Sequence, residues 1–177
     1  AKMIYTGRKI VKNSCVVFQG SAVSGVRKKG RAEVVGEYEV ITPAFVDPHC
    51  HIGMRRAGQP ATEGESNEQM DSIIPLADAL DSIMMDDQAF ESSIEAGVLY
   101  SCVVPGSGNL IGGRSAVIRN YGRDTSQALI ARAGVKAALG HNVALLVREW
   151  KGARPYTRMG ALAMLRKRFD DVRLKMD

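Results

Sequence analysis

The sequence predicts an α/β fold, in which a small β module at residues 1–42 precedes a larger unit at residues 43–177. In the first part, glycines separate short runs that are rich in β-branched residues, as in a set of short strands. From Pro43 onward, an apolar run, a long polar loop, a helical pattern and a second apolar run follow one another. This order is typical of a βαβ unit.

The β module is expected to contain strands at four places, with turns at the intervening glycines. Its apolar content is too small for an independent domain. The charged stretch 27–31 is expected to be an exposed hairpin or loop. The four predicted strands are Met3–Tyr5, Ser14–Phe18, Ser21–Val26 and Glu33–Ile41.

The larger unit is expected to begin with a buried strand at Ala44–Val46, which leads into a functional loop. The polar stretch 54–67 is longer than most connections, and a short helix is expected within 68–81. Asp86 is the predicted N-cap of a helix at Asp87–Ala96, whose Phe90 and Ile94 face one side. A second buried strand is expected at Val98–Val104.

The remaining chain contains a Gly-rich loop at 106–113, a predicted strand at Ser115–Arg119, and a stretch at Ala128–Leu139 that suits either strand or helix. A long helix is predicted at Arg158–Met176, because apolar residues recur at helical spacing. That apolar stripe is expected to pack in the core. It consists of Leu162, Leu165, Phe169, Val172 and Met176.

The strongest chemical signal is the pair His49 and His51. Side chains two residues apart on a strand project to the same face, so both imidazoles can reach one divalent metal. Asp47 stands two residues earlier and is predicted to orient a histidine or to approach the metal itself. Cys50 is expected to point away and to pack.

The run from Pro43 to Gly53 resembles the first-strand signature of the amidohydrolase superfamily, which is usually Pro-Gly, two hydrophobic residues, Asp-x-His-x-His. The β module is similar to the N-terminal sandwich portion of those enzymes, and Glu95–Val98 matches their step into the second barrel strand. The stretches 104–113 and 157–160 resemble a subgroup related to imidazolonepropionase.

The resemblance implies that the chain is the N-terminal portion of a (β/α)8 TIM-like barrel, with the site at the C-terminal strand ends. It implies one or two divalent metal ions, zinc being preferred, that activate water to attack an amide-like carbon of a small molecule. Family members complete the site with two more histidines and a catalytic aspartate on later strands.

The sequence departs from that pattern in its histidines. It has three in all, and the third, His141, matches no ligand position of the family. A full barrel needs about 250 residues. The chain is therefore expected to be the N-terminal half, inactive alone, with the remaining half on the same or a separate chain. The alternative is a non-catalytic fragment or scaffold subunit that keeps the fold, and a homo-oligomer is possible in either case.

Four residues are candidate substrate contacts: Asn109, Gly113, Arg114 and Arg158. The first three stand in or beside the Gly-rich loop, whose backbone N–H groups suit an anion. A carboxylated lysine that bridges two metals is conceivable at Lys136 or Lys151, although no spacing supports it. Neither a phosphate-loop pattern nor a dinucleotide-binding pattern is present.

The charge and hydropathy argue against two classes of partner. The net charge is +5, and basic residues outnumber acidic ones from His141 onward. No aromatic interleaving accompanies that charge, so a nucleic-acid partner is not expected. No apolar run is long enough to cross a bilayer, and the N-terminus shows no signal-peptide pattern, so no membrane partner and a cytoplasmic location are expected.

Overall fold

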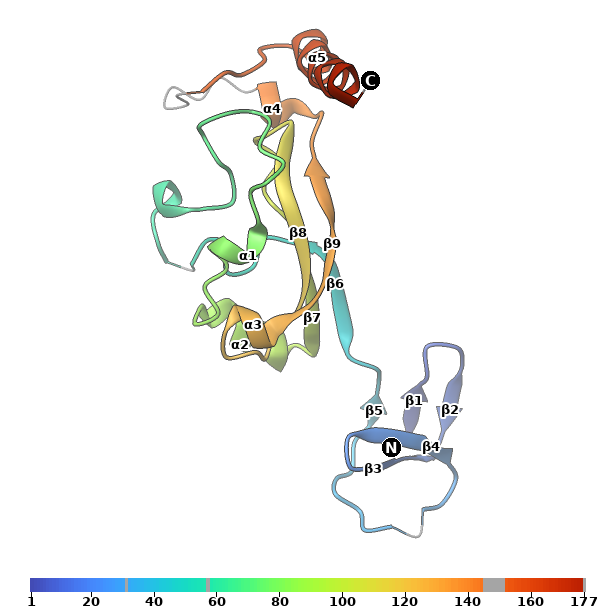
Figure 1. Ribbon diagram of the computed structural model, residues 1–177. Coiled ribbons are helices and arrows are strands. Elements are labelled where there is room, and N and C mark those ends of the chain that lie inside the picture. Colours follow the sequence, from blue (N-terminus) through green and yellow to red (C-terminus); the bar gives the residue numbers. More distant parts are fainter. Residues whose placement is uncertain (31, 57, 145–151, 177) are drawn as a thin grey trace. The chain divides into compact units, whose positions relative to one another are not determined.

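The computed structural model (Figure 1) describes residues 1–30, 32–56, 58–144 and 152–176. Lys151, one of the two lysines considered for carboxylation, lies outside these residues. The chain forms two compact units, Ala1–Ala44 and Phe45–Asp177. Helices and strands are both present, so the predicted mixed α/β class is confirmed. No helix in the described part of the chain is long and apolar enough to cross a membrane.

The first unit contains two small sheets. Strands β2 (Ile10–Lys12), β1 (Met3–Tyr5) and β5 (Val40–Ile41) form one sheet, and β3 (Cys15–Gln19) pairs with β4 (Ala22–Arg27) in the other. The predicted strand Glu33–Ile41 is wrong except for its last two residues. Among the described residues, Val34 and Val35 have no partner strand and remain about three-quarters exposed, at 70% and 74%. A segment with high strand propensity does not form a strand unless neighbouring side chains and a partner strand stabilise it.

The second unit is organised around one sheet in the order β6-β7-β8-β9. Its strands are β6 (Phe45–Cys50), β7 (Val98–Val103), β8 (Ile111–Arg119) and β9 (Leu129–Ala137). The pair β6–β7 is parallel and is connected through helix α2 (Gln88–Glu95), which confirms the predicted βαβ unit. The predicted burial of its first strand is wrong, since Phe45 and Val46 are 56% and 58% exposed. Both β7–β8 and β8–β9 are antiparallel. The ambiguous stretch after Ala128 is therefore a strand, in a long hairpin rather than in a further parallel repeat.

Short helices complete the loops of this unit: η1 (Ala61–Glu63), α1 (Ala79–Ser82), α3 (Thr125–Ala128) and α4 (His141–Ala144). The predicted N-cap of α2 is wrong by one residue. Asp87, not Asp86, accepts the hydrogen bond of the Ala89 N–H. Asp86 instead pairs with Arg56 at 2.6 Å. The helix begins where a carboxylate can reach back to its free N–H groups.

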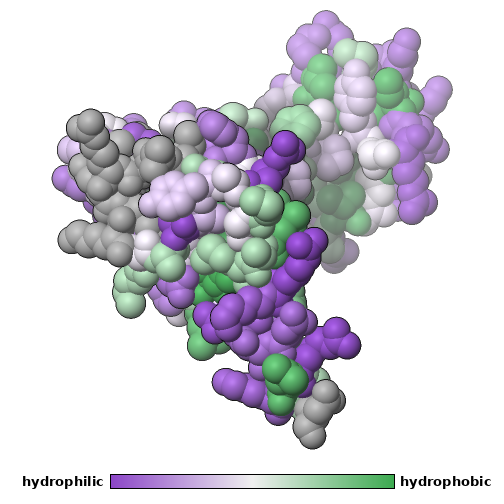
Figure 2. Space-filling view, turned by 90° about the horizontal axis from the view of Figure 1, so that it is seen from above, coloured by the Kyte–Doolittle hydropathy of each residue, from purple (hydrophilic) through white to green (hydrophobic). Residues whose placement is uncertain are grey.

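Helix α5 (Arg158–Met176) has the predicted bounds, but the prediction that its apolar stripe packs in the core is wrong for every stripe residue except Leu165. Phe169 is 60% exposed, and Met176 is 81% exposed. Among the described residues, the first half of the helix has a packing partner, since Ala161 is buried in a cluster with Ile73, Leu110 and Val143 and Leu165 packs against that cluster. Figure 2 shows hydrophobic residues interspersed with hydrophilic ones on the exposed surface.

The main core lies between one face of the sheet and the helices beside it. Phe90 from α2 and Ile83 after α1 meet Val103 and Ile118 of the central strands. The core also lies against the chain just after the two histidines. Gly53 has a positive φ of 76°, and a Cβ there would stand 2.9 Å from the Phe90 ring. A glycine is thus required where the chain leaves the histidines and turns toward the core.

Candidate metal centre

Strand β6 forms one edge of the sheet, and the two histidines lie at its C-terminal end. His49 lies within the strand, and His51 follows directly after it. The Asp47 carboxylate accepts a hydrogen bond from the backbone N–H of His49 at 3.0 Å. Asp47 therefore holds the backbone that carries the first histidine, and Pro48 stands between them without an N–H of its own. Both imidazoles are exposed, and their ring centroids are 5.8 Å apart.

The His51 ring is oriented by a backbone carbonyl of the neighbouring strand end. Its Nδ1 lies 2.7 Å from the Val104 oxygen. A carbonyl oxygen only accepts hydrogen bonds, so Nδ1 must carry the proton. The Nε2 lone pair of His51 is then available to a metal, which is the usual arrangement for a metal-binding histidine.

The His49 ring faces a lysine from strand β9. Lys136 Nζ lies 3.4 Å from His49 Nε2 and 3.4 Å from the Ser107 hydroxyl oxygen. An ammonium donates hydrogen bonds, so the His49 Nε2 presents its lone pair on this side. Burial lowers the pKa of the Lys136 ammonium below its ordinary value.

Cys50 packs against the main core, as the sequence predicts. Its Sγ lies 3.7 Å from the Cys102 carbonyl oxygen. Burial raises the pKa of the Cys50 thiol, with smaller opposing effects from hydrogen bonds. A thiol that resists ionisation is a poor metal ligand, because thiolate is the form that binds.

The two histidines fit a divalent metal as part of a donor set. Neutral imidazole nitrogens suit zinc and similar ions, and both rings carry a lone pair on Nε2. Within the described ranges, no group of three or more His, Cys, Asp and Glu residues is placed to hold a metal. His141, in α4, is exposed.

The four candidate substrate contacts have different surroundings. Asn109 is fully buried, and its side-chain amide donates to the backbone oxygens of Glu68 and Asp71 at 2.7 and 2.9 Å. In this position Asn109 ties the Gly-rich loop to the polar segment 68–71. The substrate contact stays a prediction.

Asn67 is a structural partner of the Gly-rich loop that the sequence did not indicate. Its side-chain oxygen accepts the Gly108 N–H at 2.6 Å, and a Cβ on Gly108 would stand only 2.7 Å from that oxygen. Gly106 faces the same amide, and a Cβ there would overlap it. The two glycines leave space for the Asn67 side chain. This contact joins residues far apart in the sequence, so no local sequence pattern predicts it.

Gly113 and Arg114 lie in β8 beside a buried carboxylate. Gly113 has a positive φ of 110° and approaches the backbone of Ala77. Arg114 Nε lies 3.4 Å from the Asp78 carboxylate, which also pairs with Arg132 of β9. Arg158 is exposed at the first position of α5. The predicted substrate contacts of these three residues are not tested by this geometry.

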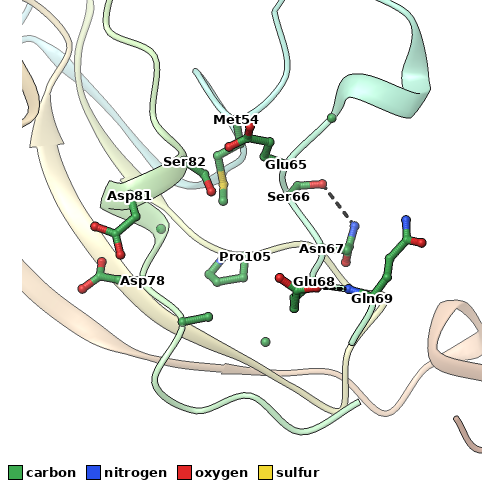
Figure 3. A pocket seen from close by; sticks show the side chains of 14 residues that line it. Met54, Glu65, Ser66, Asn67, Glu68, Gln69, Asp78, Asp81, Ser82 and Pro105 are labelled. Carbon is green, nitrogen blue, oxygen red and sulfur yellow. Dashed lines mark hydrogen bonds between the residues drawn. The ribbon is translucent and has the colours of Figure 1, made fainter. Parts of the chain in front are cut away.

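A polar pocket of about 480 Å³ lies beside the Gly-rich loop (Figure 3). The segment 64–69 forms one wall and residues 77–82 form another, with Pro105 and Gly112 between them. Carboxylates line it from both sides: Glu65, Glu68, Asp78 and Asp81. The lining includes neither of the two histidines, and Asp78 already has two arginine partners.

The role of Asn109 can be measured through stability. Replacing Asn109 with alanine removes two buried hydrogen bonds and leaves two carbonyl oxygens without their donor. We expect a loss of about 2 kcal/mol in the free energy of unfolding, measured by urea denaturation. Asn142, which is exposed, provides a control: its replacement with alanine is expected to change stability by less than about 0.5 kcal/mol. An unchanged midpoint for the Asn109 variant would contradict this role.

Comparisons with known proteins identify relatives over part of their length. The chain is 30% identical over 142 residues to "Amidohydrolase tasK" of Hapsidospora irregularis, which covers 73% of this chain and 14% of that protein. It is similar to the crystal structure of an amidohydrolase from Thermotoga maritima MSB8, with a TM-score of 0.75 and 30% identity. That match covers 91% of this chain and 43% of the other. No protein-family model matches.

Proposed function

Because this chain is related to the amidohydrolases, we propose that it contributes to a metal-dependent hydrolase of amide-like C–N bonds in a small molecule. The chain spans less than half the length of either relative, so the proposal concerns the part of the site that these residues build. The relatives are named as amidohydrolases, and neither name specifies imidazolonepropionase. The assignment to that subgroup stays a prediction.

His49 and His51 are the proposed metal ligands, and zinc is the proposed metal. The supporting observation is that the His51 Nδ1 is held by the Val104 oxygen at 2.7 Å, which leaves Nε2 as the ligand atom. Asp47 holds the His49 backbone by its hydrogen bond. The chemistry that a bound divalent metal would supply here is activation of water for attack on the substrate carbon.

The other ligands and the carboxylate that accepts the proton belong, in this proposal, to a further part of a TIM-like barrel on the same or a separate chain. The parallel β6–β7 pair would be its first two strands, with the site at their C-terminal ends. The second candidate is a non-catalytic subunit that keeps the fold. It is favoured by the lack of a three-ligand group within the described ranges.

Zinc binding distinguishes these candidates. We expect H49A and H51A each to lower zinc affinity by about a hundredfold, because each removes one of a few ligands. The measurement is a zinc titration against a colorimetric chelator, with metal content checked by mass spectrometry. The control is H141A, which removes an exposed histidine outside the pair and is expected to bind zinc as the wild type does. Equal zinc affinity in H49A and wild type would favour the non-catalytic subunit.

A further inference from the structure

Lys136 is a half-buried cation without a counter-ion. Among the residues that the structure describes, no carboxylate lies within 4.0 Å of its ammonium group. Two other basic residues of the same hairpin, Arg114 and Arg132, share the buried Asp78 carboxylate. A partly desolvated positive charge without a partner is unfavourable, so this position calls for an anion.

The surroundings of Lys136 indicate where that anion would bind. The ammonium nitrogen lies 3.4 Å from His49 Nε2 and 3.4 Å from Ser107 Oγ. The lysine comes from β9, the histidine from β6, and the serine from the loop after β7. Three segments far apart in the sequence thus bring one ammonium group within 3.4 Å of both a proposed metal ligand and a hydroxyl oxygen.

A metal on His49 would make the need for an anion stronger. The Nε2 lone pair would be taken by the metal, so the ammonium would lose that acceptor and face a second positive charge. Ser107 offers a neutral oxygen, which cannot compensate either charge. A negatively charged oxygen between the two cations satisfies both.

We propose that Lys136 and Ser107 form a binding subsite for a carboxylate of the substrate, next to the metal ligand His49. This rests on the proposed function, and it narrows the substrate to an amide-like compound that carries a carboxylate close to its scissile bond. Lys136 supplies the charge, and the Ser107 hydroxyl donates a second hydrogen bond to the same group.

The test uses a matched pair of probes on the zinc-loaded protein. N-acetylglycine carries an amide and a carboxylate, and N-acetylglycinamide replaces the carboxylate with a neutral amide. Binding is followed by NMR, through the C2–H signals of His49 and His51, so the readout does not depend on turnover. We expect the wild type to bind N-acetylglycine about tenfold more tightly than its amide, as for one charge-assisted hydrogen-bonded contact.

Two variants decide whether Lys136 is responsible. K136M removes the charge but keeps the length of the side chain, and it is expected to abolish the tenfold preference while zinc content stays unchanged. K167M removes an exposed charge on α5 and is expected to keep the preference. S107A is expected to reduce the preference about threefold.

The proposal fails if wild type shows no preference for the carboxylate, or if K136M keeps it. If the proposed function is wrong, the wild-type protein will instead show no zinc affinity. A metal-free protein that still prefers N-acetylglycine in a Lys136-dependent way would support the subsite and reject the hydrolase.

Discussion

Replacing Gly113 with alanine is expected to destabilise the second unit by about 3 kcal/mol. Gly113 adopts a φ of 110°, which a residue with a Cβ rarely adopts, and this strain alone costs about 1–3 kcal/mol. The added Cβ would also overlap the Ala77 carbonyl oxygen. The Ala77 oxygen accepts the N–H of the next residue, Arg114, at 2.7 Å, so it cannot move away freely.

The matched control is Gly134→Ala in the facing strand β9. A Cβ on Gly134 would meet no heavy atom of the described residues within 4 Å, and its φ is not in the left-handed region. We expect the Gly134 variant to unfold within about 0.5 kcal/mol of wild type, measured by urea denaturation followed by circular dichroism. Equal stability of the two variants would show that Gly113 does not constrain the backbone. A substrate role would then account better for the glycine.

Replacing Asp78 with alanine is also expected to reduce stability by about 3 kcal/mol. The Asp78 side chain is 4% exposed and pairs with Arg114 and Arg132, whose side chains are each 48% exposed. It also caps α1, since its carboxylate accepts the Leu80 N–H at 3.1 Å. Removing it leaves two arginines without their shared anion and a helix without its cap.

Two further variants separate the contributions of Asp78. D78N keeps a side-chain oxygen that can cap the helix but removes the charge, so its stability is expected between those of wild type and D78A. D81N changes an exposed carboxylate in the same helix and is expected to stay within about 0.5 kcal/mol of wild type. The proposal for Asp78 is wrong if D78A and D81N denature at the same urea concentration.

The sequence was informative wherever local chemistry decides the outcome. The helical spacing of apolar residues predicted α5 with its observed bounds, and the Asp-rich stretch before α2 predicted its start to within one residue. The spacing of the two histidines predicted that both rings stand at one strand end, and they lie at the end of β6. Each of these features depends on periodicity or capping within a few residues.

Other features depend on partners distant in the sequence, so only the tertiary structure decided them. Residues 33–38 form no strand, although they favour one, because no strand in the described part of the chain pairs with them. Most of the apolar stripe of α5 is exposed because, in the described part of the chain, it is the stretch 161–165 of the helix that packs against a cluster. The Asn67 side chain packs against the Gly-rich loop and accepts the Gly108 N–H, a contact between residues that are 41 positions apart in the sequence.

By itself, the sequence determined that this is an α/β protein with a histidine pair at one strand end, and it indicated the relationship to the amidohydrolases. The alternation of side chains along a strand and the short histidine motif both lie within about ten residues, so they can be recognised in the sequence alone. Only the tertiary structure decided which atoms face the histidines. The Val104 oxygen that orients His51 and the Lys136 ammonium beside His49 come from other strands. Their approach is set by sheet pairing over more than fifty residues, which no local pattern encodes.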